Sequence, residues 1–301
     1  MFETNFRLAE LSLAGLSSFA HPGGVVQTAS PVVLPDDGRP LLLFLHGWQD
    51  NAASFDALFS RLTPACHWVA VDWPGHGWSP SRSADNYYHF FDYLDDVHQL
   101  MALIPSREIV LVGHSLGALV SGCYAAAYPE QVTGLVLIEG LAPLYEAPEQ
   151  VVERLRQGLK GRQRYREFAE RFASRRMGSF DEALALRCAV NSLSASQLTP
   201  LVKRALCRDE HGWYWRHDSR LRCDSLYRMS EDQAKALMSA VGCPVLSIIG
   251  AHGFTRLKQP EGGFDWLPRA EQVEVAGGHH CHLESPQAVC DQIIKFLSQF
   301  K

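Results

Sequence analysis

The chain has 301 residues, of which 47% are hydrophobic and 20% charged, a balance typical of soluble globular enzymes with a sizeable core. Its net charge of -5 at pH 7 argues against a nucleic-acid-binding protein, since those carry an excess of positive charge. No apolar run approaches the roughly 20 residues that span a bilayer, and no signal peptide is evident. The eight cysteines form no Cys-x-x-Cys pair. We therefore expect a cytoplasmic protein with reduced thiols.

Short apolar runs alternate with helical patterns along most of the chain. The runs cover residues 41–45, 68–71, 109–112, 135–138, 245–249 and 273–275. Several are apolar throughout, which is typical of parallel strands buried on both faces. Helical patterns cover residues 54–62, 86–104, 116–128 and 286–300. This order predicts an α/β fold with a mostly parallel open sheet and helices on both faces.

The alternation breaks between residues 144 and 241. Helical patterns fill that stretch, and no convincing strand run interrupts them; they cover residues 148–176, 181–190, 196–206 and 230–241. Because open α/β sheets bind ligands at the carboxyl ends of their strands, we expect a helical cap over that edge. The predicted organisation is a core domain of residues 1–143 and 242–301 with a cap of residues 144–241.

A Gly-x-Ser-x-Gly sequence at residues 113–117 follows the third apolar run directly. A buried strand, this sequence and a helical pattern together are typical of a nucleophile elbow, in which the serine stands at the tip of a sharp turn. We therefore expect Ser115 to be the nucleophile, the amide of Leu116 to face a developing oxyanion, and His114 to support the turn. The alternative is a glycine-rich turn without a catalytic role.

The first apolar run ends in His46-Gly47-Trp48. A loop at this place can supply a second N–H group to the oxyanion. We assign that donor to the backbone of Trp48, with Gly47 allowing the close approach and His46 in support. The alternative is a simple turn at the end of a strand.

Histidines gather near the end of the chain, at residues 279, 280 and 282. A loop after the last strand can carry a base to the serine. Three histidines beside Cys281 also suggest a metal site, but adjacent histidines point apart on most backbones and no second ligand cluster is evident. We expect no metal and no cofactor.

The order of these motifs resembles the α/β-hydrolase superfamily over nearly the whole chain. The matching segments are residues 46–48, 72–77, 113–117 and 278–284. In that family the last motif usually reads Gly-His-x-x-His-x-Glu-x-Pro with its first histidine as the base, so the resemblance implies His279 rather than His280 or His282. Residues 215–221 are similar to a segment of the serine hydrolase-like subgroup.

The acid of the family's triad is displaced in this sequence. Many members carry Gly-x-x-Asp after the strand that corresponds to residues 245–249, but here Gly253 stands at the aspartate position. Other members, including several haloalkane dehalogenases, place the acid after the preceding strand, where this chain has Glu139. The resemblance therefore implies Glu139 as the acid. The alternatives are that Glu139 only binds local amides, or that Asp265 is the acid.

These residues together predict a serine hydrolase of carboxylic ester-type bonds that acts on a small molecule through an acyl-enzyme, with a hydrophobic acyl group as one option. Thioester, lactone or C–C bond hydrolysis by the same triad remains an alternative. A second alternative is a ligand-binding protein that keeps the fold without catalysis. The sequence leaves the acyl group, the alcohol and the oligomeric state open.

Overall fold

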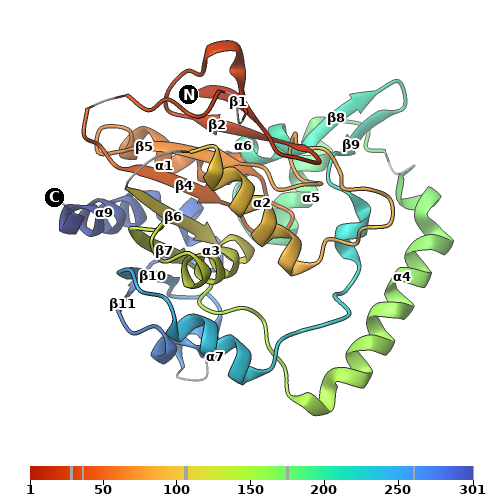
Figure 1. Ribbon diagram of the computed structural model, residues 1–301. Helices are drawn as coiled ribbons and strands as arrows, with labels where there is room; N and C mark the ends of the chain where they lie inside the picture. Colours follow the sequence, from red (N-terminus) through yellow and green to blue (C-terminus); the bar gives the residue numbers. More distant parts are fainter. Residues whose placement is uncertain (28–29, 36, 105–107, 174–175, 260–261, 301) are drawn as a thin grey trace.

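The computed structural model describes residues 1–27, 30–35, 37–104, 108–173, 176–259 and 262–300. Within that part of the chain, a nine-stranded sheet runs through the molecule (Figure 1). Its strands are β1 (Phe2–Arg7), β2 (Ser12–Ser17), β3 (Val25–Val26), β4 (Leu41–Leu45), β5 (His67–Val71), β6 (Ile109–His114), β7 (Gly134–Ile138), β10 (Val245–Gly250) and β11 (Ala270–Val275). Their order across the sheet is β11-β10-β7-β6-β4-β5-β2-β1-β3.

The six apolar runs of the sequence form the parallel part of this sheet, from β11 to β5. Each of β4, β5, β6 and β7 is buried along its whole length, which explains why their sequences do not alternate. In contrast, β2 pairs antiparallel with both β5 and β1 at the other side of the sheet. The mostly parallel α/β sheet is therefore confirmed, while β1 to β3 add an edge that the sequence did not predict.

Helices cover both faces of the sheet. On one face lie α1 (Asp56–Leu62), α8 (Cys281–Glu284) and α9 (Pro286–Leu297), and on the other lie α2 (Phe90–Ala102), α3 (Leu116–Ala127) and α7 (Glu231–Ser239). Strand β4 shows the division, because Leu41, Leu43 and Leu45 join one core cluster whereas Leu42 and Phe44 join the other. The two cores fix the strand ends from which the site is built.

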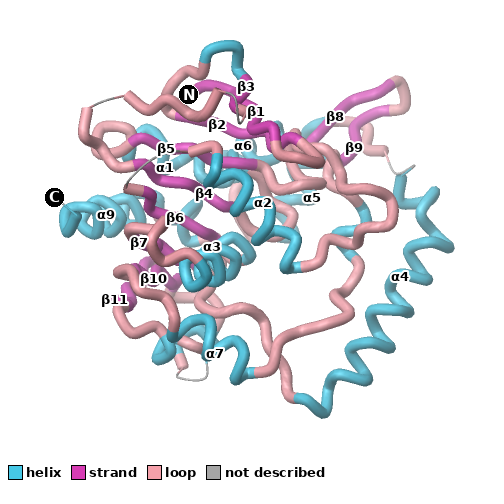
Figure 2. Tube along the Cα trace, in the orientation of Figure 1, coloured by secondary structure: helices cyan, strands magenta, loops and turns pink. Residues whose placement is uncertain are grey.

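The segment between β7 and β10 departs from the strand–helix alternation. It holds α4 (Val151–Ala173), α5 (Phe180–Asn191), α6 (Ala195–Ala205) and then α7, close to the four predicted helices; residues 174–175 of the first prediction lie outside the described part. Figure 2 shows α4 at the right of the view, apart from the sheet, whereas α7 packs on α3.

One expectation for this segment is wrong, because it contains a hairpin of β8 (Leu206–Asp209) and β9 (Gly212–Trp215). Each strand has only four residues, and those of β9 are all half-buried, so no apolar periodicity marks them in the sequence. These strands form through their antiparallel pairing with each other, which places Leu206 opposite Trp215, and not through a sequence pattern within either strand.

Candidate active site

Ser115 stands at the turn between β6 and α3 with φ 50° and ψ -115°, a conformation that non-glycine residues rarely adopt. Glycine is needed on both sides of it. A Cβ on Gly113 would lie 2.4 Å from backbone atoms of Gly117, and one on Gly117 would lie 1.9 Å from the carbonyl oxygen of Leu45. Close packing of α3 on the sheet therefore creates the strained turn, and the Ser115 side chain remains partly exposed at its tip.

Glu139 follows β7 and reaches the loop of His279. Its Oε2 lies 3.3 Å from His279 Nδ1 and accepts the amide of Phe254 at 3.1 Å, while Oε1 accepts the amide of Gly250 at 2.7 Å. A Cβ at Gly253 would lie only 2.0 Å from Oε1. The glycine at the position where the family often carries aspartate thus leaves the space that the Glu139 carboxylate fills.

The Glu139 carboxylate is held in its ionised form. Burial by itself raises its pKa, but the hydrogen bonds from His279 and from the amides of Gly250 and Phe254 bring the pKa below its ordinary value. A charged acceptor at Nδ1 keeps the proton on that nitrogen, so Nε2 of His279 is the nitrogen able to accept a proton. The Phe254 ring packs on the imidazole with 4.3 Å between ring centres, which limits its rotation.

Two hydrogen bonds of the His46 ring hold the loop after β4 in place. Nδ1 of His46 donates to the Gly47 carbonyl at 2.7 Å and Nε2 accepts the amide of Trp73 at 2.9 Å, while burial lowers the pKa of His46 to about 4. A Cβ on Gly47 would lie 2.8 Å from Nδ1 of His114, so a larger residue cannot stand there. The next residue, Trp48, is 39% exposed and lies at the edge of the cavities described below.

A buried carboxylate joins this loop to two others. Asp50 pairs with Arg187 of α5 at 2.6 Å, and its Oδ2 lies 3.5 Å from ring nitrogens of His114 and His280. Burial lowers the pKa of His114 to about 4, so its ring is neutral, and Nε2 donates to the His279 carbonyl at 2.8 Å. Sequence analysis missed Asp50 and Arg187, since no motif marks a pair 137 residues apart.

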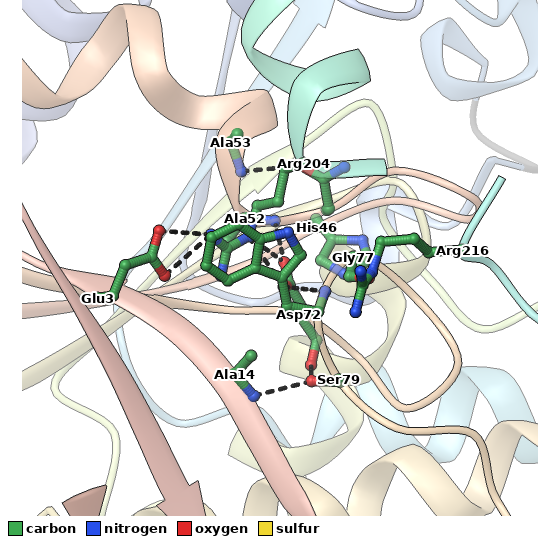
Figure 3. A network of polar contacts seen from close by, with 12 residues as sticks. Glu3, Ala14, His46, Ala52, Ala53, Asp72, Gly77, Ser79, Arg204 and Arg216 are labelled. Carbon is green, nitrogen blue, oxygen red and sulfur yellow. Dashed lines mark hydrogen bonds and ion pairs between the residues drawn. The ribbon is translucent and has the colours of Figure 1, made fainter. Parts of the chain in front are cut away.

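A second buried ion pair fixes α6 to the sheet (Figure 3). Nε of Arg204 donates to both carboxylate oxygens of Asp72 at 2.9 and 3.0 Å, and its Nη1 donates to Glu3 of β1 at 2.9 Å. Asp72 also accepts the amides of Ala52 and Trp78, each at 2.8 Å. The segment after β7 is thereby attached to the loops that follow β4 and β5.

Three cavities share Trp48 in their lining, and two of them contain Ser115. The large apolar cavity, of about 520 Å³, contains Ser115 and is lined by Leu119, Leu141, Ala142, Leu144, Phe254 and Leu257. The aromatic cavity, of about 310 Å³, is lined by Tyr88, Phe90, Phe91, Tyr93 and Tyr227. The polar cavity, of about 190 Å³, also contains Ser115 and is lined by Gln49, Asp50, Arg187, Asn191, His279 and His280.

This architecture is matched by known proteins. The model of the alpha/beta hydrolase fold family matches residues 40–286, most of the chain. The chain belongs to this family.

Relatives of this alpha/beta hydrolase extend the match. A serine hydrolase-like protein of Danio rerio is 31% identical over 271 residues, covering 87% of this chain and 82% of that protein. A probable serine hydrolase of Drosophila melanogaster is 29% identical over 273 residues, again covering 87% and 82%. The crystal structure of a hypothetical protein from Pseudomonas aeruginosa PAO1 has a TM-score of 0.81 at 30% identity and covers 99% of both chains.

The predicted site residues of this alpha/beta hydrolase come together. Ser115, Leu116, Glu139 and Trp48 line the large apolar cavity, and His279 joins Ser115, Gly47 and His114 in the polar one. Asp265 lies in a short 3₁₀ helix (Phe264–Trp266), whereas His279 pairs with Glu139 in the described part of the chain. Over the same residues, no group of three His, Cys, Asp or Glu side chains could hold a metal ion, and no helix is long and apolar enough to cross a membrane.

Proposed function

We propose that this alpha/beta hydrolase is a serine hydrolase that cleaves carboxylic ester-type bonds with a triad of Ser115, His279 and Glu139. The observation that carries the proposal is the 3.3 Å contact between Glu139 Oε2 and His279 Nδ1, on a histidine that shares the polar cavity with Ser115. A carboxylate in this place fixes the histidine tautomer and stabilises the imidazolium that forms during the reaction.

The reaction proceeds through an acyl-enzyme. Ser115 Oγ attacks the substrate carbonyl carbon while His279 Nε2 takes its proton, and the carbonyl oxygen becomes an oxyanion held by the amides of Trp48 and Leu116. Leu116 begins α3, so the positive end of that helix also faces the oxyanion. The imidazolium then gives its proton to the leaving alcohol oxygen as the ester C–O bond breaks. Water, deprotonated by His279, attacks the acyl carbon and releases the acid.

The segment of residues 144–241 is proposed as the cap of this site. Arg187 of α5 forms part of the wall of the polar cavity, and Leu144 and Tyr227 line the cavities on the apolar side. The substrate is a small molecule enclosed between this segment and the strand ends. The same triad could serve a thioester, a lactone or a C–C bond, and a substrate panel separates these chemistries.

Covalent labelling tests the proposal. A fluorophosphonate probe should add to one peptide, the one that contains Ser115, as seen by mass spectrometry of the whole protein and its digest. Ser115→Ala should abolish labelling and ester turnover. Ser298→Ala, which changes an exposed serine just after α9, should retain both. Undiminished labelling of Ser115→Ala would refute the mechanism, and absence of labelling and turnover in the unmodified protein would favour the ligand-binding alternative.

A further inference from the structure

The cavities at Ser115 are chemically unlike one another. The large apolar cavity has two charged side chains in its lining, Glu139 and Arg256. The Glu139 oxygens accept hydrogen bonds from two amides and His279, and the Arg256 guanidinium lies over the Tyr145 ring at 4.3 Å. The remaining lining offers mainly hydrocarbon to a ligand. A polar group placed there would lose its hydration without a strong partner in return.

The aromatic cavity adjoins this surface, and its lining combines aromatic and leucine side chains with the charged side chains of Arg222, Asp224 and Arg228. Trp48, Leu116, Leu119, Pro143 and Leu144 line both it and the large apolar cavity, so the two lie side by side. Their volumes of about 520 and 310 Å³ each fall in the range of pockets that enclose a small-molecule ligand. An apolar chain that starts at Ser115 therefore has room to extend past Leu119.

The polar cavity is smaller and is lined by hydrogen-bonding groups. Its volume of about 190 Å³ lies below the range of drug-sized pockets, so it accepts only a compact group. Asn191, the last residue of α5, has its Nδ2 3.3 Å from His280 Nε2. The Asp50–Arg187 pair makes the wall polar while its opposite charges balance.

The position of the base decides which part of the substrate enters which cavity. In an acyl-enzyme mechanism, the histidine that takes the serine proton later gives it to the leaving group. His279 is among the residues that line the polar cavity, whereas the large apolar cavity contains Ser115 and Leu116. The leaving group is therefore on the polar side and the acyl group on the apolar side.

From this division we propose that the substrates are esters that join an extended apolar acyl chain to a compact, uncharged, hydroxyl-bearing alcohol. The inference rests on the proposed function and adds its substrate class. Each methylene that enters the apolar side should raise kcat/KM about fourfold, from about 0.8 kcal/mol per buried CH₂. A hydroxyl on the leaving group should add about fivefold, the effect of one net hydrogen bond of about 1 kcal/mol.

The test compares matched esters by titrating the acid released. In the 2-hydroxyethyl series, kcat/KM should rise about fourfold per methylene from acetyl to hexanoyl. Among hexanoyl esters, 2-hydroxyethyl should exceed propyl, which has the same number of heavy atoms, and should also exceed benzyl, because neither of these two groups carries a hydroxyl for the polar cavity to bind. A flat acyl series, or preference for propyl or benzyl over 2-hydroxyethyl, would overturn the proposal.

Variants assign each preference to its cavity. Leu119→Trp fills the wall common to the two apolar cavities and should lower hexanoyl turnover by a larger factor than acetyl turnover, with the circular dichroism spectrum as the check of folding. Thr255 is exposed and lines the large apolar cavity, so Thr255→Trp should also lower hexanoyl turnover more than acetyl turnover. The control is Gln259→Trp, at an exposed residue four positions further along the chain that is not among the residues lining this cavity, and it should change neither. Asn191→Leu should remove the 2-hydroxyethyl preference and leave the acyl series unchanged.

The two proposals fail in different ways. If no ester is turned over and Ser115 is not labelled, the proposed function fails. If turnover depends on Ser115 but Leu119→Trp and Thr255→Trp affect acetyl and hexanoyl esters equally, the division of the cavities is wrong while the triad remains. Loss of the hexanoyl preference in Asn191→Leu, with the hydroxyl preference kept, would show that the two sides are reversed.

Discussion

Replacing Arg204 by methionine should destabilise this protein more than any surface arginine substitution would. Arg204 is 5% exposed and Asp72 is completely buried, and the guanidinium meets the carboxylate through two hydrogen bonds (Figure 3). Methionine keeps much of the apolar stem but removes the charge. Asp72 then remains as a buried anion whose carboxylate keeps, among the described residues, the amides of Ala52 and Trp78 as partners.

The expected loss follows from the cost of an unpaired buried charge. Removing one partner of a buried ion pair costs about 3–5 kcal/mol. With an unfolding entropy of about 2.1 cal/mol/K per residue, a chain of this length loses roughly 5–8 °C in Tm. In the double variant Asp72→Asn, Arg204→Met the charge is gone as well, so part of this loss should be recovered. The recovery is incomplete because asparagine has one side-chain oxygen and can accept the amide of Ala52 or of Trp78 but not both.

Thermal and urea unfolding followed by circular dichroism measure this effect. The matched control is Arg208→Met on β8, an exposed arginine over the Trp213 ring, which should change the free energy of unfolding by less than about 0.5 kcal/mol. Equal midpoints for Arg204→Met and Arg208→Met would refute the argument, as would a double variant less stable than Arg204→Met.

Other expected outcomes concern the site. His279→Ala should lower kcat by several orders of magnitude and His280→Ala by much less, both measured on the same ester. An inactive His280→Ala would show that His280, and not His279, is the base. Glu139→Gln should fold normally yet turn over sharply more slowly, because an amide stabilises the imidazolium less, and unchanged kcat would exclude Glu139 as the acid. The urea midpoint should fall from pH 7.5 to pH 5.5, since the unfolded chain binds protons that the folded one does not. An unchanged midpoint would contradict the lowered pKa values of the buried histidines, about 4 for His46, about 3 for His76 and about 4 for His114.

Much of the fold could be predicted because its signals are local. A strand such as β4 is buried on both faces, so each of its residues is apolar and the run is visible without tertiary information. The turn at Ser115 is equally local, because Gly113 and Gly117 are required by contacts within the strand–turn–helix unit and the adjacent β4. The short strands β8 and β9 carry no such signal and were missed.

The candidate site residues lie in motifs that are visible in the sequence, whereas the surroundings of the site are not. The apolar strands, the glycines that permit the strained serine, and the glycine at position 253, which makes Glu139 the candidate acid, can all be recognised in the amino-acid sequence. The pairing of Arg187 with Asp50 and of Arg204 with Asp72, over separations of 137 and 132 residues, depends on how the folded chain brings distant segments together. The apolar cavity and the polar cavity that both contain Ser115 are likewise visible only in the tertiary structure. The physical reason is that backbone conformation and burial leave a periodic local pattern, whereas an ion pair or a cavity exists only where distant segments pack together.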